Sequence, residues 1–296
     1  MLLAHLSDLH IRDSGDVRWL ERQLDRIAAC VPDHLAISGD VLDRWNPGVL
    51  AEILDALGQR GLLDPARLTI IHGNHDLASS GGHPRRRADV WRLIGRFWDP
   101  PPLIHRRRRA FHAQIAARAA DVAPRAPLVK TLGNGVRLAV IDSVPAPWRP
   151  VRIVGGRLIV QHGLGFVGSA QSQWLAQQGG TTPLVTLMHH YPLPVPPFEW
   201  KPTQAEWPRL ARAPLFRGVQ VPMHLPDADR ERFWRAAEDS QTRLVICGHV
   251  HRARLEHHKG IAIGLNGQSG AAWAGRVIAY YTITTAGITG ATETVS

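Results

Sequence analysis

Short apolar runs in this chain end, one after another, in clusters of acidic, amide and imidazole side chains. Buried parallel strands have this appearance in a sequence, and their carboxyl ends meet at one edge of a sheet. The pattern therefore restricts the chain to an α/β fold whose strands deliver polar residues to a common place. The clusters are Asp8-Leu9-His10, Gly39-Asp40-Val41-Leu42-Asp43, Gly73-Asn74-His75-Asp76 and Gly248-His249-Val250-His251.

The segments between the first clusters repeat apolar residues at helical spacing, over 16–30 and 47–57. Three strand–cluster–helix units in succession predict a parallel, doubly wound layer. Further helices are expected over 89–97, 108–120, 169–178 and 227–239. Strands are expected over 2–7, 34–38, 68–71, 136–142, 183–188, 243–247, 260–265 and 277–285.

The domain organisation is expected to be one domain over residues 1–296, with a lid-like insertion at about 191–226. That tract is rich in proline and shows no clear periodicity, which is typical of a functional loop. Hydrophobic residues make up 44% of the chain, which excludes general disorder. No signal peptide or membrane-spanning segment is predicted, and Cys30 and Cys247 are expected to be buried free thiols in a reducing cytoplasm.

The chain is basic, with 35 lysines and arginines against 25 acidic residues, for a net charge of +10. Nearly all of this positive charge comes from arginine. A proteome that is rich in arginine would explain this composition without any anionic ligand. Two arginine runs, 85–87 and 106–109, follow the third cluster. Because most such runs are solvated faces, they favour an anionic substrate only weakly.

Carboxylate, amide and imidazole groups together suit divalent first-row metals, so manganese, iron, zinc and cobalt are all compatible. Asp8 and His10 are two residues apart, and side chains at that spacing point the same way in an extended strand. Gly39 permits a sharp turn that leaves the Asp40 carboxylate free to bridge. Two cations about 3.5–4 Å apart polarise a phosphate ester and activate a water. The pattern thus predicts a phosphoester hydrolase.

The order D-x-H, G-D-x-x-D, G-N-H-D, H-H, G-H-x-H resembles the calcineurin-like metallophosphoesterase superfamily, over residues 8–251. Motifs 39–43, 73–76 and 247–252 are most similar to bacterial phosphodiesterases of the cyclic-nucleotide and glycerophosphodiester kind. The resemblance implies a four-layer α/β/β/α sandwich with its site where the strands of two sheets end. One departure is His72, which stands before Gly73 where many relatives have proline.

The resemblance also implies roles for individual residues. It places one metal on Asp8, His10, Asp40 and His251, and the other on Asp40, Asn74, His189 and His249. His189 is chosen over its neighbour because it directly follows the expected strand 184–188. A metal-bridging hydroxide would attack phosphorus in line.

The residues around the expected metals also receive roles by this resemblance. His75 would help to protonate the leaving oxygen, and Asp76 would hold its ring. Asn74, His190 and Arg44 are the candidate substrate-binding residues. The other histidines, including His72 and His112, fit no motif and are expected to be ordinary polar residues.

The resemblance leaves the substrate open. The leading prediction is a phosphodiesterase acting on a small-molecule phosphodiester. The alternatives are a nuclease acting on DNA or RNA, which the net charge would favour, and a hydrolase of a lipid-linked phosphodiester, which the aromatic residues of 191–226 would suit. A non-catalytic scaffold is disfavoured because every expected ligand position is present. The oligomeric state is likewise open.

Overall fold

The computed structural model describes residues 1–78, 99, 101–144, 151–154, 157–160, 163–200, 219–267, 269–270 and 276–295. Its helices are α1 (Ser14–Cys30), α2 (Pro47–Gln59), α4 (Pro101–Ala116), α5 (Gly168–Ala176) and α7 (Asp227–Asp239). The strands before the middle of the chain are β1 (Leu2–Leu6), β2 (His34–Ile37), β3 (Leu68–Ile70), β4 (Leu128–Thr131), β5 (Arg137–Val140), β6 (Val151–Val154) and β7 (Arg157–Val160). The later strands are β8 (Leu184–Leu187), β9 (Phe198–Trp200), β10 (Val219–Val221), β11 (Thr242–Cys247), β12 (Ala253–His258), β13 (Ile261–Asn266), β14 (Arg276–Ile283) and β15 (Ile288–Val295).

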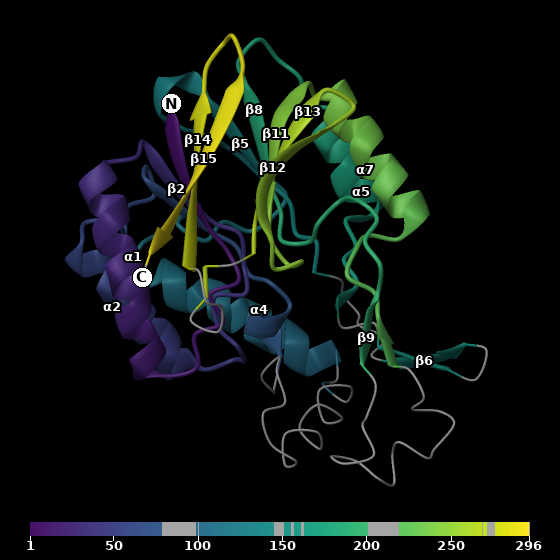
Figure 1. Ribbon diagram of the computed structural model, residues 1–296, viewed down its shortest axis with the longest axis horizontal. Coiled ribbons are helices and arrows are strands. Elements are labelled where there is room, and N and C mark those ends of the chain that lie inside the picture. The colour runs from purple at the N-terminus through teal and green to yellow at the C-terminus, as the bar shows by residue number, and fades with distance from the viewer. Residues whose placement is uncertain are drawn as a thin grey trace, which may run out of the picture.

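Two large sheets form the centre of the molecule (Figure 1). The first has the order β15-β14-β1-β2-β3, and β1, β2 and β3 run parallel. The second has the order β12-β13-β11-β8-β5-β4, and β13, β11, β8 and β5 run parallel. Antiparallel strands form one edge of the first sheet and both edges of the second. Within each sheet, the parallel strands therefore end at the same edge, as the alternation of strands and helices in the sequence predicted.

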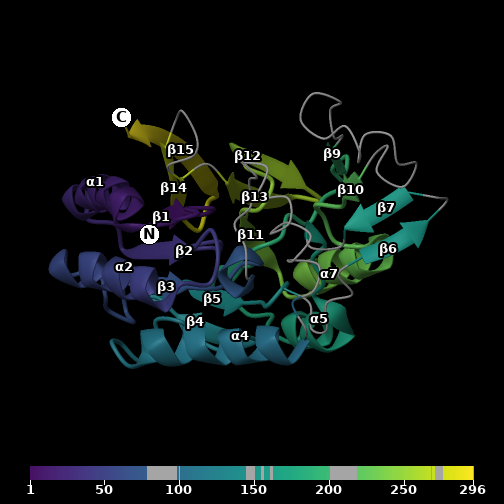
Figure 2. The ribbon, with the colours of Figure 1, turned by 90° about the horizontal axis from the view of Figure 1, so that it is seen from below.

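Three apolar layers hold these elements together. Leu3, Val140 and Ile246 belong to the buried cluster between the two sheets. The outer face of the first sheet packs against α1 and α2, and that of the second against α5 and α7. Figure 2 shows the helices α1 and α2 at one side of the molecule and α5 and α7 at the other, with both sheets between them. The predicted four-layer α/β/β/α sandwich is thus confirmed.

The first two helices begin where their sequences provide capping groups. The Asp13 side chain accepts hydrogen bonds from the backbone N–H of Gly15 and Asp16 at the start of α1. Asn46 caps α2 in the same way, and Pro47 occupies its first position. The helix expected over 108–120 begins earlier, at Pro101. The helix expected over 89–97 lies outside the described residues.

The described parts of the tract 191–226 contain regular secondary structure. It contributes β9 and β10 to a third sheet of order β6-β7-β10-β9. Tyr191 and Leu225, near its two ends, are buried in the core of the second sheet. The described parts of the tract therefore contain strands that its sequence did not indicate, and residues 201–218 lie outside the described part. Its role as a lid stays a prediction.

The two cysteines differ in their surroundings. Cys247 is a buried free thiol at the end of β11, as predicted. Cys30 is free but exposed, because it lies on the solvent side of the last turn of α1, so the expectation for that residue is wrong. None of the helices in the described ranges has the length and apolar character needed to cross a bilayer.

Candidate metal centre

The predicted ligands gather where the strands of both sheets end. Asp8 follows β1, and its backbone N–H donates to the Gly39 carbonyl, 3.1 Å away, beyond the end of β2. The second sheet reaches the same point, because the backbone N–H of His249 donates to Asp8 Oδ2 at 2.8 Å. A side chain on Gly248 would collide with Ser7 Oγ at 1.9 Å, so this approach requires glycine. This hydrogen bond thus joins two residues that are 241 positions apart in the sequence.

The backbone at these strand ends is strained. Five of the predicted ligands have left-handed backbone geometry, which residues other than glycine rarely adopt: Asp8 (φ 53°), His10 (φ 46°), Asp40 (φ 50°), His249 (φ 72°) and His251 (φ 50°). Such geometry costs about 1–3 kcal/mol per residue and concentrates at functional sites. Gly39, with φ 102°, makes the sharp turn that the sequence predicted before Asp40.

One group of ligand atoms lies around Asp8. Its Oδ1 atom is 3.4 Å from His251 Nε2 and 3.8 Å from His10 Nε2. The two imidazole nitrogens are 3.3 Å apart. Asp8 is fully buried, and Oδ1 accepts no hydrogen bond of good geometry. A buried carboxylate oxygen in this position requires a positive partner, and a divalent cation between these three residues would supply it.

A second group lies around His189. Its Nε2 atom is 3.0 Å from Asn74 Oδ1 and 3.2 Å from His249 Nδ1. The other ring nitrogens face carbonyl oxygens, since His189 Nδ1 is 2.9 Å from Ser38 O and His249 Nε2 is 2.8 Å from Gly163 O. Donation to these carbonyls fixes the tautomers that leave the inward-facing nitrogens as ligands.

Asp40 joins the two groups. Its Oδ1 atom accepts a hydrogen bond from the backbone N–H of His75 at 2.7 Å, which fixes the plane of the carboxylate. Its Oδ2 atom then lies 3.4 Å from His189 Nε2 on one side and 3.9 Å from His10 Nε2 on the other. A carboxylate in this position can bridge two cations.

The electrostatics of the site favour bound cations. Burial alone would raise the pKa of the Asp8 and Asp40 carboxyls, but the adjacent histidines hold both below their usual range. Burial would lower the pKa of His189, yet the Asp40 carboxylate overrides it and raises that pKa to about 9. In the absence of metal, a proton on His189 therefore occupies the position where a cation would neutralise Asp40. The seven predicted ligands fit a pair of divalent cations, and metal binding there would release protons.

A sequence model of the calcineurin-like phosphoesterase family matches residues 1–253. The chain belongs to this family. Solved structures agree in fold with this phosphoesterase: a dimetal phosphatase from Danio rerio aligns at 12% identity and a TM-score of 0.58, covering 100% of this chain and 99% of its own. The Thermus thermophilus protein TT1561 aligns at 10% identity and a TM-score of 0.52, covering 98% and 97%. No sequence among the curated proteins matches this phosphoesterase.

His75 of this phosphoesterase lies beside the ligands, as predicted, but Asp76 does not hold its ring. His75 Nδ1 is 3.1 Å from the Asp43 carbonyl oxygen, and its Nε2 is 3.9 Å from Asp40 Oδ2. Both oxygens of Asp76 instead accept backbone hydrogen bonds, from Leu42 at 2.7 Å and from Gly73 at 2.8 Å. The role predicted for Asp76 is therefore wrong. It fixes the two loops that carry Asp40 and Asn74, and burial together with the nearby Asp40 raises its pKa to about 7.

The other predicted substrate contacts differ in placement. His190 is buried and its Nδ1 is 3.0 Å from Ser143 Oγ, while its ring offers a ligand atom within 4.8 Å of those of His189 and His249, so its substrate contact stays a prediction. Its position beside His249, with ring centroids 4.3 Å apart, makes it a support for that ligand. Arg44 is exposed and pairs with no acidic group among the described residues, so an anion contact stays a prediction. Sequence reasoning missed Ser7, whose hydroxyl donates to Asp8 Oδ2 at 2.7 Å, and Ser143 beside His190, because no motif marks either hydroxyl.

Proposed function

We propose that this phosphoesterase is a metal-dependent phosphodiesterase that uses two divalent cations and acts on a small-molecule phosphodiester. The observation that carries the proposal is the position of Asp40 Oδ2, which faces His189 on one side and His10 on the other. The similarity of motifs 39–43 and 73–76 to those of bacterial phosphodiesterases supports a diester rather than a monoester. The free thiols Cys30 and Cys247 are compatible with a reducing, cytoplasmic location.

When bound, a pair of divalent cations would polarise the phosphoryl oxygens and lower the pKa of a coordinated water. Asp8, Asp40 and the ligand histidines would set the positions of these cations. The hydrogen bond from His75 Nδ1 to the Asp43 carbonyl orients the imidazole ring of His75. In this orientation Nε2 faces the Asp40 carboxylate. From that position His75 would deliver a proton to the departing alkoxide, which is a poor leaving group without one.

A nuclease activity is the second candidate, because the net charge of +10 would attract a polyanion. The test is a substrate panel with added manganese: a cyclic nucleotide, bis-nitrophenyl phosphate, a nitrophenyl monoester, single-stranded DNA and a lipid diester. The proposal predicts turnover of small diesters above the monoester and DNA. His251→Ala should abolish this turnover, and His257→Ala, an exposed histidine on β12, is the matched control. Retained activity in His251→Ala, or a preference for DNA, would refute the assignment.

A further inference from the structure

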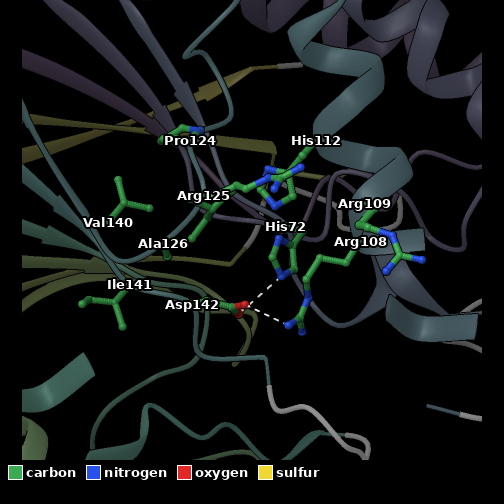
Figure 3. A pocket seen from close by; sticks show the side chains of 11 residues that line it. His72, Arg108, Arg109, His112, Pro124, Arg125, Ala126, Val140, Ile141 and Asp142 are labelled. Carbon is green, nitrogen blue, oxygen red and sulfur yellow. Dashed lines mark ion pairs between the residues drawn. The ribbon is translucent and has the colours of Figure 1, made fainter. Parts of the chain in front are cut away.

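A second cavity lies between the end of β3, the helix α4 and the end of β5 (Figure 3). Its volume is about 250 Å³, which is enough for a small organic molecule. None of the residues that line it is a predicted metal ligand. The cavity is therefore a feature of the fold that the metal centre does not explain.

The lining of this cavity is strongly cationic. Arg108, Arg109 and Arg125 face it, with Asp142 as the single carboxylate. That carboxylate is already engaged, because its Oδ2 lies 3.2 Å from an Arg108 guanidinium nitrogen. Arg109 and Arg125 are exposed, and neither forms an ion pair or a side-chain hydrogen bond with any described residue. Two guanidinium groups thus remain available to an anion.

Two of the residues that line the cavity carry buried nitrogen atoms that make no hydrogen bond of good geometry with the described residues. His72 is 5% exposed, and neither of its ring nitrogens makes a hydrogen bond of good geometry. Its Nε2 pairs with Asp142 Oδ1 at 3.3 Å (Figure 3), whereas its Nδ1 has neither a hydrogen bond nor an ion pair with a described residue. The Nε atom of Arg108 is likewise buried and unpartnered. Buried donors are nearly always satisfied, so these atoms indicate a ligand that offers acceptor oxygens.

The opposite wall of the cavity is apolar. The apolar residues among the lining are Ile71, Pro124, Ala126, Val140 and Ile141. Figure 3 shows the arginines and His72 on one side and Val140, Ile141 and Ala126 on the other. A bare anion would satisfy only the first side. A molecule with a charged end and a flat or apolar body would contact both.

We propose that this cavity is a second binding site, separate from the metal centre, for a small organic phosphate. The phosphoryl oxygens would accept hydrogen bonds from Arg109, Arg125 and His72, and the organic part would pack against Val140. Arginine is suited to this task because its planar fork binds phosphate with two parallel hydrogen bonds. The proposal does not depend on the reaction carried out at the metal centre.

The test is isothermal titration calorimetry of the full chain with three probes: adenosine 5′-monophosphate, inorganic phosphate and adenosine. Each titration is made with manganese and again with a chelator. Binding of the monophosphate to this cavity should persist in the presence of the chelator. We expect the monophosphate to bind more tightly than phosphate, and adenosine not to bind. Arg109→Ala and Arg125→Ala should each weaken binding of the monophosphate by about tenfold, the usual effect of losing one charged hydrogen bond.

Arg106→Ala is the matched control, because Arg106 is exposed on the same helix but does not line the cavity. Circular dichroism would establish that each variant is folded. The proposal is overturned if the monophosphate does not bind in chelator, or if Arg106→Ala weakens binding as much as Arg109→Ala does. Equal affinity for phosphate and for the monophosphate would overturn the role of the apolar wall.

Discussion

At the scale of single residues, His75 offers the sharpest test of the chemistry. Its ring is 4.4 Å from that of His10, and its Nε2 faces the Asp40 carboxylate. If it donates a proton rather than binding metal, His75→Ala should lower kcat by about 10²–10⁴-fold and leave the metal content unchanged. Elemental analysis of the purified variant beside His257→Ala would check this. Loss of metal would show instead that His75 is a ligand.

His34 gives a stability prediction that depends on pH. It is buried, with Nε2 2.9 Å from Thr69 Oγ1 and Nδ1 3.1 Å from Ala66 O, and burial lowers its pKa from 6.5 to about 4. The folded state therefore favours the neutral His34 ring, whereas the unfolded state gains a proton below pH 6.5. The contribution of His34 to the free energy of unfolding is complete above pH 6.5 and is lost as the pH falls toward 4. By linkage the loss approaches about 3 kcal/mol.

Urea unfolding at pH 7.5 and 4.5 would measure this effect, with His34→Gln as the comparison. The wild-type free energy of unfolding should fall more between the two pH values than that of the variant. Because His5 and His112 are present in both proteins, the difference isolates His34. An identical pH dependence in the two proteins would contradict the prediction.

The residue scale also shows how far sequence reasoning reaches. All seven predicted ligands converge, because each lies in the loop that follows a strand and strand ends meet by topology. The partner of the His75 ring could not be predicted in this way. Asp76 is adjacent to His75 in sequence whereas Asp43 is 32 residues away, and the choice between them depends on which backbone N–H groups the folded loops present to Asp76.

At the scale of secondary structure, Asp229 joins two helices. It lies in the first turn of α7, is 1% exposed, and accepts hydrogen bonds from the backbone N–H of Val167 at 2.7 Å and Gly168 at 2.9 Å, at the start of α5. The helix α5 has no capping side chain of its own. Asp229→Ala should lower the free energy of unfolding by about 2 kcal/mol, because two buried N–H groups lose their acceptor.

Denaturant unfolding would measure this loss, and Asp227→Ala is the matched control. Asp227 is in the same turn, but its side chain is 81% exposed. Asp229→Asn should lie between the alanine variant and wild type, since an amide retains one acceptor oxygen. Equal stability of the two alanine variants would show that Asp229 does not cap α5.

Three strands that the sequence failed to predict share a physical cause. The helix 227–239 and the buried strands were predicted because apolar side chains mark them clearly. The strands β4, β12 and β15 lie at sheet edges and expose many of their side chains. Their hydrophobic alternation is therefore weak, and their pairing depends on the strand beside them rather than on their own residues.

At the scale of the whole molecule, we expect bound cations at the candidate metal centre to contribute to stability. Asp8 and His10 follow a strand of the first sheet, and His249 and His251 follow one of the second, so bound cations would connect the two sheets. A ligand that binds only the folded state stabilises it by about 2.7 kcal/mol at a hundredfold excess over its Kd. Chelator should lower the melting temperature of wild type, and manganese should restore it. His251→Ala should show a much smaller shift in the same calorimetric scans, whereas an equal shift would place the stabilising metal elsewhere.

The first sheet brings together the two ends of the described chain. β1 has β2 on one side and β14 on the other, and the amino group of Met1 donates to the Ile283 carbonyl at 2.9 Å. During synthesis, β1 therefore lacks one hydrogen-bonded neighbour until Arg276–Ile283 has left the ribosome. Throughout that interval the apolar residues Leu3 and Leu6 can promote aggregation of the nascent protein, which chaperones counteract in cells.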